Sequence, residues 1–136
     1  YGFDEHTPEN TVKFFRMLQK VFPFKIQTIQ TDNGTEFTYK YISEDKECPF
    51  DTVLRKAGVE HKLIPPRTPW HNGKVERSHR NDQRYFYDWE HFKSLDEFNQ
   101  KLAEHLVWSN NKTMRTLGRK SPVQLLREKL SSLAEN

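Results

Sequence analysis

The chain has 136 residues, a length that suits one domain with a core of its own. Charged residues make up 30% and hydrophobic residues 34%, yet ten Phe, five Tyr and three Trp supply large side chains for an interior. The single cysteine, Cys48, excludes an internal disulfide and a cysteine-rich metal site, and it fits a reducing compartment. No apolar run approaches the length of a membrane span and no secretory leader is recognisable, so we expect no membrane partner.

The charge is divided unevenly along the chain. Residues 1–60 carry a net charge of −2 and residues 61–136 a net charge of +5, which gives the formal total of +3. A basic half favours a polyanionic partner, because it neutralises phosphates and releases their counterions. An ordinary solvated basic surface is the alternative, and the asymmetry alone does not decide between the two.

The first part of the chain predicts a helix and then a strand. Thr7 and Pro8 are typical of a helix start, and apolar residues recur at helical spacing up to Pro23, which ends the helix. Residues 24–31 alternate as a half-buried strand does, with Phe, Ile and Thr at residues 24, 26 and 28 on one side. The turn signal Asn33-Gly34 ends this strand.

The middle of the chain predicts a loop, a short helix and a second strand. The polar stretch from Thr38 to Pro49 is interpreted as an excursion loop. Asp51 is expected to cap a helix over residues 52–57, which Gly58 closes. Residues 59–64 form the next strand.

Helices dominate the remainder. The prolines at 65, 66 and 69 hold the chain extended until Asn72-Gly73 releases it into a helix whose inner side is only partly apolar. Ser94 and Glu97 form the capping box of a long helix, and Ser121-Pro122 opens a last, short one. This order of helices and strands predicts one α/β domain over residues 1–136.

Two segments carry most of the chemical information. They are Thr31-Asp32-Asn33-Gly34-Thr35-Glu36-Phe37 and Pro65-Pro66-Arg67-Thr68-Pro69-Trp70-His71-Asn72-Gly73-Lys74-Val75-Glu76-Arg77. Asp32 follows a strand and Glu76 lies in the first turn of a helix, where carboxylates are well placed to bind a hard divalent cation. Taken singly, the first segment is typical of a tight turn, and Glu76 of a residue that complements the helix dipole. Together they indicate a metal site.

These segments resemble the integrase catalytic core of the DDE transposases, a family that includes bacterial insertion-sequence transposases and retroviral integrases. The resemblance runs from about Thr7 to about Leu126. It implies a ribonuclease H-like fold in which Asp32 and Glu76 are the second and third acidic residues, catalytic and metal-binding. It also implies two Mg²⁺ or Mn²⁺ ions, which activate the nucleophile and stabilise the leaving oxygen of phosphoryl transfer.

The chain departs from the family's pattern in two respects. Between Asp32 and Glu76 lie 43 residues, more than is usual, and we place the excess in the loop from Thr38 to Pro49. The family's first acidic residue belongs to the first strand of the sheet, which would precede Tyr1, so we expect a fold that lacks its first strands and the first ligand. Asp4 is a poor substitute, because its polar surroundings before a helix favour a solvated or capping role.

The candidate DNA interface surrounds Glu76. Arg80 and Gln83 follow Glu76 at i+4 and i+7, on the same face of an α-helix. The partners that the resemblance implies are transposon ends and target DNA. Each of these residues alone fits an ordinary solvated position, and only their grouping indicates phosphate contacts. The residues expected to contact DNA are Lys62, Arg67, Lys74, Arg77, Arg80, Gln83 and Arg84.

Two other patterns are weaker. His61, His71 and His79 lack the short spacing of a helical zinc pair, so a zinc site is not expected. The aromatic stretch from Tyr85 to Phe92 has the composition to stack on bases, but aromatic residues at this spacing more often form a core.

The leading hypothesis is therefore a fragment of a bacterial transposase that carries out Mg²⁺-dependent DNA cleavage and strand transfer in the cytoplasm, on the nucleoid, and that is inactive alone. The rival hypothesis is a non-catalytic remnant with a DNA-binding or self-association surface. A nuclease that only hydrolyses is less favoured, because the proline-rich segment before Glu76 resembles transposases. Missing first strands would leave the strand that ends at Asp32 with an open edge, which predicts a homodimer.

Overall fold

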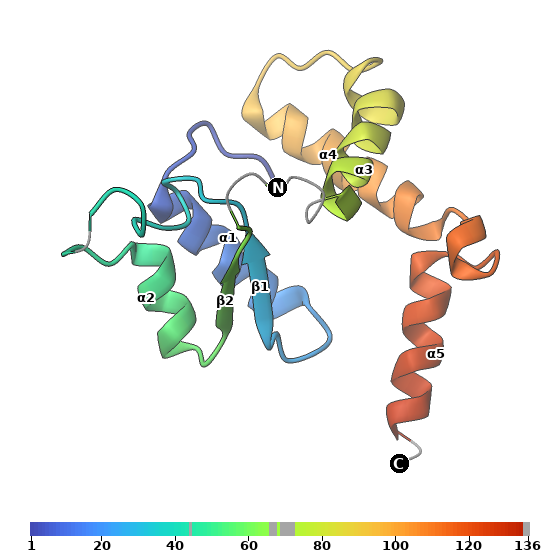
Figure 1. The fold of residues 1–136 in the computed structure, drawn as a ribbon. Helices are drawn as coiled ribbons and strands as arrows, with labels where there is room; N and C mark the ends of the chain where they lie inside the picture. Colours follow the sequence, from blue (N-terminus) through green and yellow to red (C-terminus); the bar gives the residue numbers. More distant parts are fainter. Residues whose placement is uncertain (44, 66–67, 69–72, 135–136) are drawn as a thin grey trace. The chain divides into compact units, whose positions relative to one another are not determined.

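A computed structural model gives the structure of residues 1–136 except 44, 66–67, 69–72 and 135–136. The described residues form two compact units. The strand unit is residues 3–85, and the helical unit is residues 86–136 together with residues 1–2. The elements, shown in Figure 1, are α1 (Pro8–Val21), β1 (Thr28–Thr31), α2 (Pro49–Lys56), β2 (Glu60–Leu63), α3 (Gly73–Asp82), the π-helix η2 (Gln83–Tyr87), α4 (Leu95–Asn111), the 3₁₀-helix η3 (Arg115–Leu117) and α5 (Pro122–Ala134).

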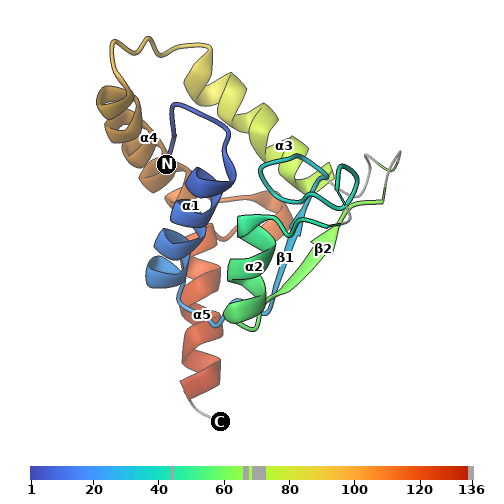
Figure 2. The same cartoon turned by 90° about the vertical axis from the view of Figure 1, so that its left-hand side faces the viewer.

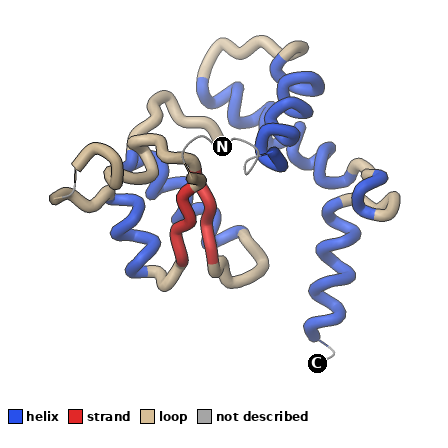
Figure 3. Tube along the Cα trace, in the orientation of Figure 1, coloured by secondary structure: helices blue, strands red, loops and turns tan. Residues whose placement is uncertain are grey.

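β1 and β2 form a parallel pair, the sheet of the strand unit (Figure 3). Thr28 lies opposite Glu60, and Thr31 lies opposite Leu63. Side chains alternate between the two faces of this pair, as a strand requires. The half-buried face carries Ile29, Thr31, His61 and Leu63, and the exposed face carries Thr28, Gln30, Glu60 and Lys62.

The predicted strand over residues 24–31 is right in kind but too long. Only residues 28–31 form strand, and the predicted alternation is wrong within it, because Thr28 is exposed and Ile29 is half buried. Ile26 is half buried as predicted. Residues 25–27 are not in a strand, so a period of two does not run unbroken from one end of the segment to the other.

The first helix begins where the sequence predicts. Thr7 is extended, its hydroxyl accepts a hydrogen bond from the Asn10 amide at 3.2 Å, and Pro8 occupies the first helical position. The second helix begins earlier than predicted. Cys48 is its N-cap and Pro49 starts it, so the prediction that Asp51 is the cap is wrong. Pro49 has the fixed φ that suits a first helical residue, and this places Asp51 inside the first turn.

The core of the strand unit forms around Phe15 of α1 and Phe50 of α2, which meet edge to face at 6.2 Å. α1 packs against α2, and α2 packs against β2 (Figure 2). The segment predicted as a polar loop is anchored in this core, since Thr38 is 3% exposed and Cys48 is fully buried. Burial raises the pKa of the Cys48 thiol above its ordinary value.

The helical unit is centred on Phe86. This ring is 3% exposed and lies 5.4 Å from the ring of Phe92 and 4.9 Å from that of His105. Of the aromatic stretch from Tyr85 to Phe92, only Phe86 is buried, and Tyr85, Tyr87 and Trp89 are 44%, 42% and 78% exposed, so the expectation of a core holds for Phe86 alone. Among the helices that the structure describes, none combines the length and apolarity needed to cross a membrane.

Helix caps in this unit follow their predicted residues closely. Ser94 accepts a hydrogen bond from the Glu97 amide at 3.1 Å at the start of α4. The Glu97 carboxylate, however, accepts from the amide of Lys93 rather than from that of Ser94, one residue away from an ideal capping box. Ser121 and Gln124 bond each other's amides reciprocally, which makes a complete capping box for α5.

Candidate metal and nucleic-acid site

Asp32 lies at the carboxyl end of β1. Because β1 and β2 run parallel, their carboxyl ends meet at the same edge of the sheet. The Asp32 side chain is exposed, and its Oδ1 accepts a hydrogen bond from the Gly34 amide at 3.0 Å. Its Oδ2 has no hydrogen-bond partner among the described residues. One carboxylate oxygen thus holds the turn, and the other is open to a ligand.

Asn33 fixes this corner to the second strand. Its Nδ2 donates to the carbonyl oxygen of Ile64 at 2.9 Å, and the Ile64 amide donates to the carbonyl oxygen of Thr31 at 3.0 Å. The Asn33 Oδ1 is buried and has no hydrogen-bond partner within the part of the chain that the structure describes. Thr31 and Asn33 are therefore both hydrogen-bonded to Ile64, the residue directly after β2.

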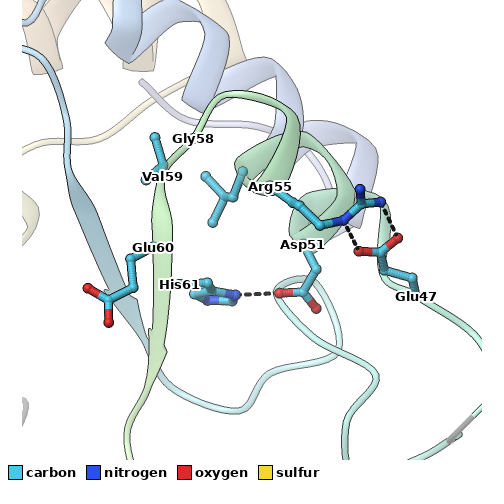
Figure 4. Close-up of a pocket in the computed structure, with 8 residues that line it drawn as sticks. Glu47, Asp51, Arg55, Gly58, Val59, Glu60 and His61 are labelled. Atoms are coloured by element: carbon cyan, nitrogen blue, oxygen red, sulfur yellow. Dashed lines mark hydrogen bonds and ion pairs between the residues drawn. The ribbon is translucent and has the colours of Figure 1, made fainter.

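His61 connects α2 with β1 on the half-buried face of the sheet. Its Nδ1 is 2.5 Å from Oδ1 of Asp51, and its Nε2 is 2.8 Å from Oγ1 of Thr31. Its ring meets that of Phe50 edge to face at 5.4 Å. Figure 4 shows the imidazole of His61 pointing at the Asp51 carboxylate. The sequence drew attention to this histidine only as a weak zinc candidate, and its carboxylate partner was assigned to a helix cap.

Of the three histidines considered for zinc, the structure describes His61 and His79. His61 contacts Asp51 and Thr31, His79 is exposed on α3, and His71 lies outside the described residues. Across residues 1–43, 45–65, 68 and 73–134, no three His, Cys, Asp or Glu residues gather as a metal site would require.

An open pocket of about 600 Å³ lies between α2 and β2 (Figure 4). The charged side chains that line it have partners. Arg55 donates from Nε and an Nη to the two oxygens of Glu47, at 3.1 and 3.0 Å. These hydrogen bonds from Arg55 lower the pKa of Glu47 below its ordinary value. Glu60 is likewise paired, with Lys62 at 3.4 Å. Since its charges are already satisfied, we assign this pocket no chemistry.

Glu76 and its neighbours lie on an exposed stretch of α3. Glu76 is exposed in the first turn of α3, a helix without any buried residue. Lys74, Arg77 and Arg80 are exposed too and have no hydrogen-bond or ion-pair partner among the described residues. Arg80 lies one turn beyond Glu76, as the helical spacing predicted. These cations are therefore available to an external anion.

The α-helical pattern on which the predicted DNA face depends ends at Asp82. Gln83 and Arg84 belong to η2, where the π-helical bonding inserts an extra residue into the turn and rotates the following side chains. The Arg84 guanidinium lies 5.5 Å from the ring centroid of Tyr85. Tyr87, the last residue of η2, stacks on Phe98 with the ring centroids 6.2 Å apart.

Two further residues predicted to contact DNA are Lys62, which lies in the sheet, and Arg67, which belongs to the proline-rich segment. Lys62 is exposed on β2 and pairs with Glu60 of the same strand. Arg67 lies outside the described residues, as do residues 69–72 of the segment that leads to Glu76. Asp4 is exposed before α1, which agrees with the solvated role expected for it.

Comparisons with known proteins agree on the type of domain. The family model described as "Integrase core domain" matches residues 57–122, from the end of α2 to the first residue of α5, a range that includes Glu76. The putative integrase ORF3 of Spiroplasma virus SpV1-C74 is 27% identical over 135 residues, which cover 93% of this chain and 37% of the viral protein. The retrovirus-related Pol polyprotein from transposon RE1 of Arabidopsis thaliana is 35% identical over 75 residues, 54% of this chain and 4% of that polyprotein.

A solved structure shows the same fold. The catalytic core domain of BIV integrase superposes with a TM-score of 0.65 at 21% identity, over 97% of this chain and 78% of that one. The predicted α/β, ribonuclease H-like fold is thus confirmed.

The comparisons relate this chain to integrase cores: the family model matches residues 57–122, the viral integrase is similar over most of the chain, and the BIV integrase core has the same fold. The chain spans little more than a third of the length of its viral relative and a small fraction of the plant polyprotein. The family model covers the segment around Glu76, whereas Asp32 lies before the matched residues.

The corner that carries Asp32 should be sensitive to the chemistry of Asn33. Asn33→Asp places an acceptor against the Ile64 carbonyl where the amide now donates, whereas Asn33→Ala only removes the donor. We expect Asn33→Asp to lower the free energy of unfolding by about 1–3 kcal/mol and by more than Asn33→Ala does. Urea denaturation of both variants measures this. Equal stability of the two would show that the Asn33–Ile64 hydrogen bond does not hold the corner.

Proposed function

We propose that this chain is part of the catalytic core of a transposase or integrase, in which Asp32 and Glu76 bind a divalent cation for the cleavage and joining of DNA strands. The observation that carries the proposal is the position of Asp32, at the shared carboxyl edge of two parallel strands with one carboxylate oxygen tied and the other open. The integrase match over residues 57–122 supports the corresponding role for Glu76.

The donor chemistry fits a hard cation. Asp32 and Glu76 are both exposed carboxylates, and oxygen is the ligand that Mg²⁺ and Mn²⁺ prefer. A bound ion would polarise a phosphoryl oxygen and lower the pKa of a coordinated water. The part that this chain supplies is the orientation of Asp32: the Gly34 amide holds Oδ1 and thereby sets the direction of Oδ2.

The α3 surface is the proposed DNA contact. Lys74, Arg77 and Arg80 are exposed cations on the helix that carries Glu76, and none of them is neutralised by a described neighbour. Phosphate contacts of this kind position a duplex without reading its sequence. Lys62, Gln83 and Arg84 extend the proposed interface, although Lys62 and Arg84 already have contacts within the protein.

A second candidate function is DNA binding without catalysis. It is favoured by one observation: within the described residues, no third acidic or histidine ligand joins a candidate metal site. A two-metal clamp needs more ligands than two carboxylates provide. The DNA surface of α3 does not depend on that third ligand, so binding would persist where catalysis fails.

We also propose self-association, in the bacterial cytoplasm and on the nucleoid. Each described strand has one hydrogen-bonded neighbour, so each has an edge without a strand partner among the described residues. Such edges favour pairing with another strand, and two copies of this chain would give a closed two-fold dimer.

We expect the purified chain alone not to cleave transposon-end DNA in Mg²⁺ or Mn²⁺, because Asp32 and Glu76 cannot hold two ions in the geometry of in-line displacement. Gel analysis of end-labelled DNA measures cleavage. Products that form with the wild-type protein and vanish with Asp32→Asn would contradict this expectation and would require a third ligand from elsewhere in the chain.

DNA affinity should depend on the cations of α3. Replacing Lys74, Arg77 and Arg80 by Gln is expected to weaken binding at low salt for any sequence, and to reduce the slope of log affinity against log salt by about one per residue replaced. Fluorescence anisotropy with a labelled duplex measures both quantities. Arg16→Gln, which removes one exposed cation of α1, is the matched control for the single change Arg77→Gln. An equal loss in these two variants would show that the effect comes from net charge and not from the α3 surface.

A further inference from the structure

The half-buried face of the sheet contains a run of polar contacts that the proposed function does not use. It begins at Asp51 in the first turn of α2, passes through His61 of β2 and reaches Thr31, the last residue of β1. The exposed fractions of the Asp51 and His61 side chains are 27% and 10%. Hydrogen bonds in such a partly desolvated place constrain geometry more strongly than they would in water.

Thr31 joins this run to the metal-ligand candidate. Its Oγ1 lies 2.8 Å from Nε2 of His61 and 2.8 Å from the carbonyl oxygen of Asp32. The Thr31 hydroxyl donates its one hydrogen to the Asp32 carbonyl oxygen and accepts from Nε2–H of His61. Nδ1–H of His61 donates to the Asp51 carboxylate, so both imidazole nitrogens carry a hydrogen in this arrangement. The backbone of Asp32 is thus connected to the Asp51 carboxylate of α2 through the Thr31 hydroxyl and the His61 imidazole.

We infer that Asp51 and His61 are positioning residues for Asp32: they hold the Thr31 hydroxyl, which holds the Asp32 carbonyl and so sets the direction of the Asp32 carboxylate. Metal-binding side chains are commonly oriented by such outer partners. Here the partner acts on the backbone of the ligand and not on its side chain. The inference rests on the proposed role of Asp32 as a metal ligand.

The strand offers a matched control that separates this role from simple packing. Thr31 lies in the same strand as Thr28, whose hydroxyl donates to the Glu60 carboxylate at 3.1 Å on the exposed face. Both residues can be changed to valine, which keeps the branched shape and the strand preference while it removes the hydroxyl. Thr28→Val is therefore a matched control for Thr31→Val.

The first measurement needs no metal. The Gly34 amide reports the position of Asp32, because it donates to Oδ1. Thr31→Val is expected to speed hydrogen exchange at the Gly34 amide about fivefold, the change that corresponds to one ordinary hydrogen bond. Thr31→Ser should restore the wild-type rate and Thr28→Val should leave it unchanged. Asp51→Ala should act like Thr31→Val, and Asp51→Asn, which keeps an acceptor for Nδ1 of His61, should change the rate less. An unchanged Gly34 rate in Thr31→Val overturns the inference.

The second measurement separates this inference from the proposed function. Electron paramagnetic resonance gives the affinity for Mn²⁺ in the wild-type chain, in Asp32→Asn and in the Thr31 variants. We expect Asp32→Asn to lose the site and Thr31→Val to weaken it about tenfold, with Thr31→Ser near the wild type. If Asp32→Asn binds Mn²⁺ as the wild type does, the proposed metal role fails, while the Gly34 exchange rates still decide the positioning. If Asp32→Asn loses the ion but Thr31→Val keeps it in full, the positioning role is wrong and the proposed function stands.

Discussion

The parallel pairing of β1 with β2 is the constraint on which the site depends. A parallel pair brings both carboxyl ends to one edge, and Asp32 and Ile64 therefore lie next to each other although 31 residues separate them in sequence. The Asn33 side chain and the Ile64 amide then fix the corner from both sides. Without this register, the exposed carboxylate of Asp32 would belong to an ordinary surface turn.

The polar contacts behind the sheet extend the same constraint into the core. Phe50 and Asp51 are neighbours in α2, and both touch His61, one through its ring and the other through its carboxylate. α2 is therefore connected both to the hydrophobic centre of the strand unit and to the residue that precedes Asp32. Packing and site geometry are coupled here through a single histidine.

Local signals in the sequence predicted most of the helices, and long-range pairings decided what the sequence could not. Thr7-Pro8 and Ser94 mark helix starts through short-range hydrogen bonds, whose partners lie within a few residues of each other in the sequence.

The cap at Cys48 was missed because Asp51 offered a stronger cap signal. In the structure, the Asp51 carboxylate contacts His61 instead. The π-helix after Asp82 was missed because a pattern of period 3.6 carries no sign of a residue inserted into the turn. The proposed roles of Asp32 and Glu76 come from motif resemblance, whereas the link from Asp51 to Thr31 depends on strand register, which the sequence does not encode locally.

Asp32 and Glu76 are proposed to bind the same cation, although one follows a strand and the other lies in the first turn of a helix. Paramagnetic broadening of amide signals by substoichiometric Mn²⁺ tests this directly, since the effect falls steeply with distance from the ion. The account predicts that the amides of Gly34 and Arg77 broaden together, and that Asp32→Asn and Glu76→Gln each abolish both effects. Broadening at Gly34 that persists unchanged in Glu76→Gln would show that the two carboxylates do not share a metal.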